Sequence, residues 1–237
     1  MARDVRPPRD PRLPVAALFD WDGTLVDTLP LIYRANVVAL REFGVDMSRA
    51  WFHDRYTPDW RAFYRALGVG EESWDQLGRR WSEEMRRGRP RAMPWARRSL
   101  RRLHRSGVRL GLITAANRAV VTPNIIRLGF DGLFETSWFS DDVAETKPDP
   151  EALVRALAEL GVDPADAVYV GDTTVDLEMT VAAGAGFVAV GSTTSEEAFH
   201  AAGAERVWSG VAAWADDLLG GVRPGGVRPG RPGPGDR

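Results

Sequence analysis

The sequence predicts an α/β fold, a doubly wound parallel sheet with a block of helices inserted after its first strand. Short apolar runs alternate with helix-like stretches along most of the 237 residues, as is typical of parallel sheets with right-handed crossovers. Residues 51–88 differ, because they hold tryptophans at helical spacing and no strand pattern. This tryptophan-rich block is the predicted insertion.

The first half of the chain supplies one strand and four helices. The run 15–19 is continuously apolar and ends shortly before Gly23, which is typical of a buried parallel strand. A helix ending near Gly44 follows it. Trp60, Phe63 and Leu67 share one face of a further helix. The predicted helices cover about 30–43, 51–67, 72–87 and 96–105.

The second half alternates strands with helices. Each strand is a short apolar run, and each helix shows the 3.6-residue period of an amphipathic segment. The predicted strands cover 108–113, 136–139, 167–170 and 187–190, and the predicted helices cover 118–128, 150–160 and 175–183.

These elements divide the chain into core, insertion and terminal segments. We expect an α/β core from 15–27 and 96–219, with a helical insertion at 28–95. Residues 1–14 are punctuated by proline and are expected to form a flexible arm. Residues 220–237 are mostly Gly, Pro and Arg, a composition that predicts a disordered tail.

Composition excludes several classes of function. The net charge is −2, so no overall field favours nucleic acid or an anionic membrane as partner. No apolar run is long enough to span a bilayer. The chain has no cysteine, which excludes disulfides, thiol catalysis and zinc–thiolate sites. A cytoplasmic location is therefore expected.

Polar residues that could share one crevice follow the predicted strands. The carboxyl ends of parallel strands form the ligand crevice of open α/β sheets. A cluster of carboxylates there suits Mg²⁺, and an ammonium with a hydroxyl suits an anion, which together describe a phosphoryl site. The candidates are Asp20, Asp22 and Thr24 after the first strand, Thr114 after the second, Lys147 before the helix at 150, and Asp172 with Asp176 after the strand 167–170.

Lys147 is the only lysine among 31 basic residues. Arginine cannot replace a compact ammonium in a tight site. The retention of one lysine at this position therefore favours a role for it in the crevice.

Four motifs in this order resemble those of the haloacid dehalogenase-like hydrolase superfamily. Helices inserted after the first motif resemble the branch with an α-helical cap, which includes phosphoglycolate phosphatase-like enzymes. The motifs are Asp20-Trp21-Asp22-Gly23-Thr24-Leu25-Val26-Asp27-Thr28, then Thr114, then Lys147-Pro148-Asp149-Pro150, and finally Gly171-Asp172 with Asp176.

The resemblance implies a role for each matching residue. Asp20 would be the nucleophile that forms an aspartyl-phosphate, and Asp22 the general acid and base. Thr114 and Lys147 would bind the transferring phosphoryl group. The metal Mg²⁺ would be held by Asp20, Asp172 and the backbone carbonyl of Asp22, with Asp176 in or next to the ligand shell.

The resemblance also narrows the chemistry. Asp22 favours phosphoryl transfer, because dehalogenases of this superfamily lack the second aspartate. A phosphonatase would need a cap lysine, and this cap has none. The expected activity is hydrolysis of a small phosphate ester, such as phosphoglycolate or a sugar phosphate. A mutase of the β-phosphoglucomutase type remains the alternative, and monomer and dimer both remain open.

Several further residues also have expected roles. Ala115 and Ala116 stand where the superfamily often has a hydrogen-bonding residue, and Asn117 is a candidate replacement. Asp27 and Thr28 are expected to cap a helix. The tryptophans of the insertion are expected mainly in its core, although some of Trp51, Trp60, Trp74 and Trp81 could face the substrate. Arg55, Arg61 and Arg65 are candidates for binding an anionic group.

Overall fold

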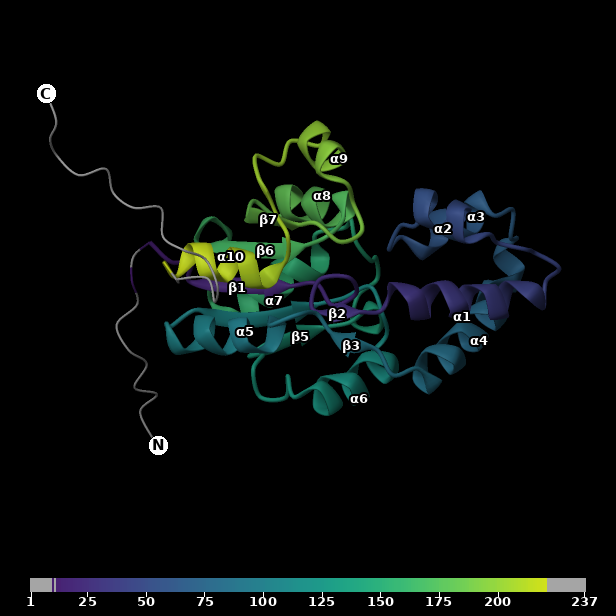
Figure 1. The fold of residues 1–237 in the computed structure, drawn as a ribbon, viewed down its shortest axis with the longest axis horizontal. Helices are drawn as coiled ribbons and strands as arrows, with labels where there is room; N and C mark the ends of the chain where they lie inside the picture. The colour runs from purple at the N-terminus through teal and green to yellow at the C-terminus, as the bar shows by residue number, and fades with distance from the viewer. Residues whose placement is uncertain (1–9, 11, 221–237) are drawn as a thin grey trace, which may run out of the picture.

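The computed structural model describes residues 10 and 12–220, and within them the main sheet has six parallel strands (Figure 1). Their spatial order is β5-β4-β1-β6-β7-β8. The predicted doubly wound parallel sheet is thereby confirmed. The strands are β1 (Ala16–Phe19), β4 (Arg109–Ile113), β5 (Thr136–Trp138), β6 (Ala167–Gly171), β7 (Gly186–Val190) and β8 (Val207–Trp208).

The expected flexible arm and disordered tail fall largely outside the described residues, which leave out 1–9, 11 and 221–237. Among the residues that are described, no helix is both long enough and apolar enough to cross a membrane.

Helices cover both faces of the sheet. Side chains of a strand alternate between its faces, and β1 shows this directly. Ala17 and Phe19 belong to a core shared with α5 and α10, whereas Ala16 and Leu18 belong to a second core with α7 and α8. The helices of the α/β part are α5 (Ala96–Arg105), α6 (Arg118–Leu128), α7 (Glu151–Leu160), α8 (Thr174–Ala182), α9 (Glu196–Ala201) and α10 (Val211–Leu218).

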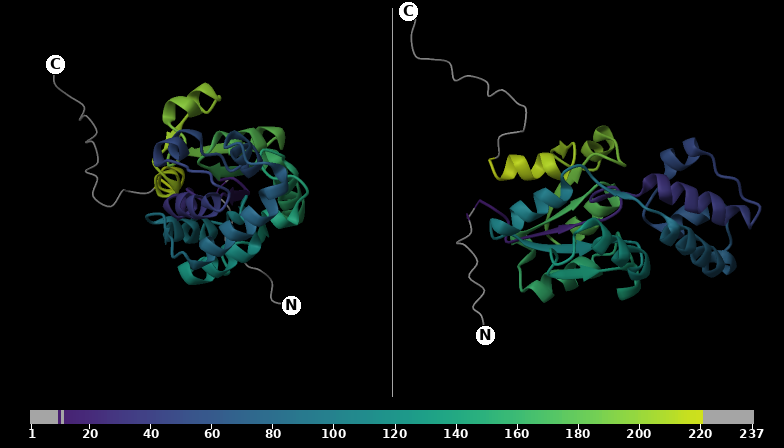
Figure 2. Two further views of the ribbon diagram at one scale, coloured as in Figure 1. Left: turned by 90° about the vertical axis from the view of Figure 1, so that its right-hand side faces the viewer. Right: turned by 60° about the horizontal axis from the view of Figure 1, so that its bottom comes forward.

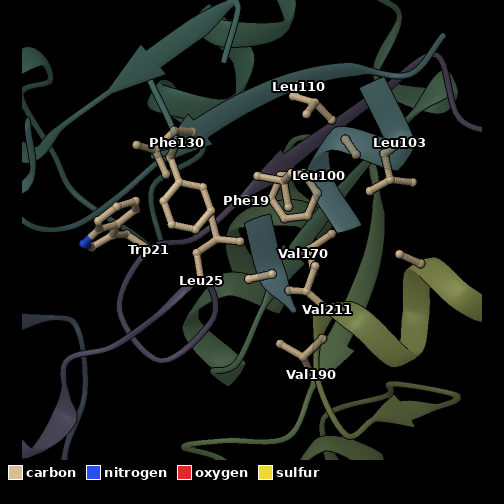
Figure 3. Packing of buried hydrophobic residues seen from close by; sticks show 14 of the residues in the cluster. Phe19, Trp21, Leu25, Leu100, Leu103, Leu110, Phe130, Val170, Val190 and Val211 are labelled. Atoms are coloured by element: carbon tan, nitrogen blue, oxygen red, sulfur yellow. The ribbon is translucent and has the colours of Figure 1, made fainter. Parts of the chain in front are cut away.

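The first of these cores lies directly behind the end of β1. Phe19 is fully buried against leucines of α5, with Val170 and Val211 nearby (Figure 3). Trp21, just beyond the strand, makes an edge contact with the ring of Phe130 at 5.6 Å. The loop that carries the first motif is therefore anchored on both sides by buried aromatic side chains.

The remaining helices lie together at one end of the molecule, beyond the sheet (Figures 1 and 2). Residues 28–95, called the insertion below, have a hydrophobic cluster of their own that contains Phe52, Phe63 and Leu77. The helices of the insertion are α1 (Leu29–Arg41), α2 (Arg49–Arg55), α3 (Trp60–Ala66) and α4 (Trp74–Arg87), with a 3₁₀ turn at Glu71–Ser73.

The predicted single helix over 51–67 is wrong, because two helices, α2 and α3, replace it. Pro58 disfavours a helical backbone at the residue before it. The Asp59 carboxylate then caps α3 by accepting hydrogen bonds from the backbone N–H groups of Arg61 and Ala62. The chain therefore leaves the helical conformation at Tyr56 and bends at Pro58, and Tyr56 lines the cavity described below.

A two-stranded antiparallel ladder joins the insertion to the sheet domain. Strand β2 (Val26–Asp27) pairs with β3 (Arg91–Ala92). Asp27 therefore lies in a strand and does not cap α1. Thr28 occupies the cap position, but its side chain forms no capping hydrogen bond.

Candidate active site

Three buried carboxylates come together at the carboxyl ends of β1 and β6. Asp20 follows β1, Asp172 follows β6 and Asp176 lies in the first turn of α8. One carboxylate oxygen from each lies within 4.8 Å of the other two. This juxtaposition is the one expected when the ends of parallel strands share an edge. A set of carboxylate oxygens fits a hard cation such as Mg²⁺.

Lys147 is the ammonium at this cluster. Its Nζ donates hydrogen bonds to Oδ1 of Asp20 at 2.5 Å and to Oδ1 of Asp176 at 2.8 Å. The side chain is almost fully buried, and Nζ lies 5.1 Å from the centre of the Tyr169 ring. Lys147 offsets two of the carboxylates, but it forms no ion pair with Asp172 within the described residues.

Asp172 is held by hydroxyl groups instead. Thr24 donates to Oδ1 at 2.9 Å and Ser192 donates to Oδ2 at 2.9 Å, while Thr193 also donates to Oδ2. The Ser192 hydroxyl also lies 2.7 Å from the carbonyl oxygen of Gly23. Three hydroxyls from the loops after β1 and β7 therefore fix this carboxylate.

Sequence reasoning missed Ser192 and Thr193. They directly follow the predicted strand 187–190 and Gly191, and their place at a strand end was the available signal. Gly23 contributes through its backbone. Its φ is +80°, and a Cβ atom there would collide with the Asp172 carboxylate. Only glycine allows this close approach.

Asp176 has a structural and an electrostatic role. Thr173 and Asp176 form a capping box at the start of α8. The Asp176 backbone N–H donates to Oγ1 of Thr173, and the Thr173 backbone N–H donates to Oδ2 of Asp176, both at 3.2 Å. Oδ1 remains the acceptor for Lys147.

Asp22 and Thr114 lie beside this cluster. Burial raises the pKa of Asp22, and hydrogen bonding with Thr28 and Thr114 opposes the rise. The Thr114 hydroxyl also accepts a hydrogen bond from the Ala116 backbone N–H at 3.1 Å. Thr28, expected as a helix cap, thus contacts Asp22 instead.

Asn117, the candidate replacement donor, lines the same cavity as Asp20 and Asp22, and its amide is hydrogen-bonded at the junction with the insertion. Its Oδ1 caps α6 by accepting from the Val120 backbone N–H at 3.1 Å, and its Nδ2 donates to Oγ of Ser82 on α4 at 3.2 Å. Asn117 therefore ties the loop after β4 to the insertion.

Burial, with crowded negative charge as a further contribution, sets the electrostatics of the site. Burial raises the pKa of Asp20 well above its usual range, Lys147 lowers it, and Asp176 and Asp172 raise it further. Burial and the neighbouring Asp176 raise the pKa of Asp172 to about 7. Burial alone would lower the pKa of Lys147, but Asp176 and Asp20 raise it well above its ordinary value. A bound cation would relieve this repulsion.

A cavity of about 610 Å³ leads from these carboxylates into the insertion. Asp20, Asp22 and Asp176 lie at one end of its lining. The aromatic side chains that line it are Tyr56, Trp60, Phe63, Tyr64, Trp74 and Trp81. Trp60, Trp74 and Trp81 both pack against the hydrophobic cluster of the insertion, as expected, and line this cavity.

The arginines proposed for the cavity are replaced by others. Arg55, Arg61 and Arg65 do not line it, and Arg61 and Arg65 form ion pairs with glutamates. Arg79 and Arg86 of α4 line the cavity instead.

Comparisons with known proteins agree on one family. The family model described as haloacid dehalogenase-like hydrolase matches residues 17–190. Phosphoglycolate phosphatase 1 from Pseudomonas aeruginosa is 30% identical over 187 residues, which cover 73% of this chain and 68% of that protein. Pyrophosphatase PpaX from Bacillus velezensis is 30% identical over 166 residues, covering 68% of this chain and 76% of that protein.

A solved structure supports the same relationship. CbbY from Rhodobacter sphaeroides, in complex with phosphate, superposes with a TM-score of 0.72 at 27% identity. The match covers 84% of this chain and 96% of that one.

Proposed function

The chain belongs to the haloacid dehalogenase-like hydrolase family and is a phosphatase, and we propose that it hydrolyses a small phosphate monoester in a Mg²⁺-dependent reaction. The observation that carries this proposal is the buried cluster of Asp20, Asp172 and Asp176 with Lys147 beside it. The relatives named for phosphoglycolate and for pyrophosphate support phosphoryl chemistry, although they differ in substrate.

Mg²⁺ would be held by the carboxylates of Asp20 and Asp172 and by the backbone carbonyl of Asp22, with Asp176 close by. The excess of negative charge in this cluster supports that assignment. When bound, the ion supplies positive charge that offsets the repulsion between the substrate phosphate and a carboxylate nucleophile.

Asp20 is the proposed nucleophile. Lys147 holds its Oδ1, which leaves Oδ2 as the attacking atom. Oδ2 bonds to phosphorus, and the bond from phosphorus to the ester oxygen breaks, which gives an aspartyl-phosphate on Asp20. Lys147 and the Thr114 hydroxyl contact the phosphoryl oxygens and favour their developing charge.

Asp22 is the proposed acid and base. Burial raises its pKa, which favours a protonated carboxyl that can give its proton to the departing ester oxygen. In the second half-reaction, Asp22 takes a proton from water as the water oxygen attacks phosphorus. Inorganic phosphate leaves and the Asp20 carboxylate is regenerated.

The insertion, residues 28–95, is proposed to act as a cap. Its helices α3 and α4 line the same cavity as Asp20 and Asp22, and Ser82 hydrogen-bonds Asn117 across the junction. A cap over this cavity limits access of bulk water to the aspartyl-phosphate.

Phosphate release from phosphoglycolate and from p-nitrophenyl phosphate tests the proposal, with Mg²⁺ and with EDTA. We expect release only with Mg²⁺, and Asp20→Asn should lower kcat by roughly a thousandfold or more. Asp27→Asn is the matched control, because it makes the same change at an exposed residue of the same motif. Wild-type turnover by Asp20→Asn would contradict the mechanism. An isomerised sugar phosphate without net phosphate release would identify a mutase instead.

A further inference from the structure

The cavity beyond the carboxylates has more room and more aromatic surface than a two-carbon phosphate ester would use. Its volume of about 610 Å³ falls within the roughly 300–1,000 Å³ of pockets that enclose drug-sized ligands. The residues of the insertion that line it are therefore expected to contact the organic part of the substrate.

One wall is a continuous series of aromatic rings that begins beside the carboxylates. Tyr56 starts the series, because it lines the cavity together with Asp20 and Asp22. The ring centres of Tyr56 and Phe63 lie 6.2 Å apart, those of Phe63 and Tyr64 5.7 Å, and those of Tyr64 and Trp60 6.2 Å. Trp60 then meets Trp74 at 5.2 Å.

On α4, the lining of the cavity has an open position at Gly78, called the groove below, with an indole about one helical turn to either side. Trp74, Gly78 and Trp81 are spaced to lie on one face of the helix, and all three line the cavity. Gly78 weakens a helix interior, yet packing does not require it, because a Cβ atom there would meet no atom within 4 Å. The missing side chain leaves space in the cavity between the two rings.

Trp81 packs in part against the hydrophobic cluster of the insertion and also lines the cavity. Across the described residues, no aromatic ring, cation or hydrogen-bond acceptor is paired with it. Trp74 differs, because its Nε1 donates to the Val69 carbonyl and Arg65 covers its ring. A ligand could therefore stack on Trp81 without displacing a cation, whereas stacking on Trp74 would compete with Arg65.

We propose that the organic part of the substrate carries a flat aromatic or heteroaromatic ring, which stacks on Trp81 in the groove at Gly78. The inference rests on the proposed phosphatase function and specifies its substrate class. Aromatic stacking is favourable and tolerant of ring type, and the cavity connects this groove to the carboxylates that act on the phosphate.

Three synthetic esters test the proposal with equal leaving-group chemistry: ethyl phosphate, 2-cyclohexylethyl phosphate and 2-(1-naphthyl)ethyl phosphate. Each releases a primary alcohol, so differences in kcat/KM report contacts made by the distant group. We expect the naphthyl ester to exceed ethyl phosphate by about tenfold or more and the cyclohexyl ester by several-fold. Equal values for the naphthyl and cyclohexyl esters would overturn the preference for a flat ring.

Substitutions on α4 test whether the preference for the naphthyl ester depends on the groove. Gly78→Leu fills the groove and should lower the naphthyl-to-ethyl ratio of kcat/KM at least about fivefold. Trp81→Leu should lower the same ratio by a similar factor. Gly78→Ala is a second filling variant that should fold well, because alanine strengthens a helix. Gln76→Leu is the matched control on the exposed side of α4, and it should leave the ratio unchanged.

The outcomes separate the two proposals. An unchanged ratio in Gly78→Leu and Trp81→Leu, with folding verified by thermal unfolding, would overturn the assignment of the groove. Hydrolysis of ethyl phosphate without any preference for the naphthyl ester would overturn the substrate class alone. A failure of wild-type protein with Mg²⁺ to release phosphate from all three esters would overturn the phosphatase function, and the substrate class with it.

Discussion

The Asp172 carboxylate is expected to destabilise the metal-free fold, so Asp172→Asn should stabilise the protein in EDTA while abolishing its activity. Burial and Asp176 raise the pKa of Asp172 from 3.8 to about 7. At about 1.4 kcal/mol for each pKa unit, this shift lowers the free energy of unfolding at pH 8 by roughly 4 kcal/mol.

The amide does not recover all of this free energy. Three hydroxyls donate hydrogen bonds to the Asp172 carboxylate. In Asp172→Asn an NH₂ group replaces one of the two carboxylate oxygens, so its N–H groups would face hydroxyls that donate to that oxygen in the wild type. Rotation of a hydroxyl makes it an acceptor, at a cost of about 1–2 kcal/mol for the rearranged hydrogen bonds. We therefore expect Asp172→Asn to raise the free energy of unfolding by about 2 kcal/mol in EDTA at pH 8.

The gain should depend on pH in a defined direction. Because the pKa is higher in the folded protein than in the unfolded chain, the folded protein keeps this proton to higher pH. The unfavourable contribution is absent below about pH 4, develops between pH 4 and 7, and is complete above pH 7. The stability difference between variant and wild type should grow over the same interval.

Urea unfolding at pH 5 and pH 8, in EDTA and in Mg²⁺, measures these differences. Mg²⁺ should raise the stability of the wild type and have less effect on Asp172→Asn. Asp131→Asn, at an exposed turn, is the control and should change little. A loss of 1 kcal/mol or more by Asp172→Asn in EDTA at pH 8 would refute the argument from charge crowding.

Two further predictions concern the groups around this cluster. Lys147→Met should lower the free energy of unfolding at pH 8 by roughly 3 kcal/mol, because it leaves two buried carboxylates without their ammonium; urea unfolding measures this, and unchanged stability would count against the ion pairs. Ser192→Ala should raise the Mg²⁺ concentration for half-maximal activity about tenfold, because Asp172 loses one orienting donor. Ser195→Ala, at the start of α9, is its control, and an equal response of both variants would exclude a specific role for Ser192.

Five of the six strands of the main sheet and most helices could be predicted because their signals are local, whereas β8, α9 and α10 were not predicted. The run at 15–19 is continuously apolar since both faces of β1 are covered. The helices predicted at 96–105 and 118–128 match α5 and α6. The pairing of β2 with β3 could not be predicted, because each strand is only two residues long and the partners lie far apart in the sequence. The break at Pro58 was visible in the sequence but was outweighed by the regular spacing of aromatic residues.

The grouping of the carboxylates with Lys147 could be predicted, because the ends of parallel strands share one edge of the sheet. Asp20 and Asp172 directly follow predicted strands, and Lys147 precedes the predicted helix at 150–160. The hydroxyls of Ser192 and Thr193 were missed because serine and threonine are ordinary loop residues. Their contact with Asp172 depends on how the loop after β7 lies over β6. Which tryptophans line the cavity could not be chosen from the sequence, since spacing alone does not distinguish the side of a helix that faces a core from the side that faces a cavity.

Buried charge defines the part of the cavity at the sheet, and open space beside aromatic rings defines the part in the insertion. The residues that carry out the reaction are therefore different from those that select the substrate. At the sheet, crowded buried charge lowers the stability of the metal-free protein, and the same charge favours binding of a cation. In the insertion, Gly78 gives up helix stability and leaves space between two indoles. Substitutions on α4 can therefore change which organic group fits without altering the carboxylates that act on phosphorus.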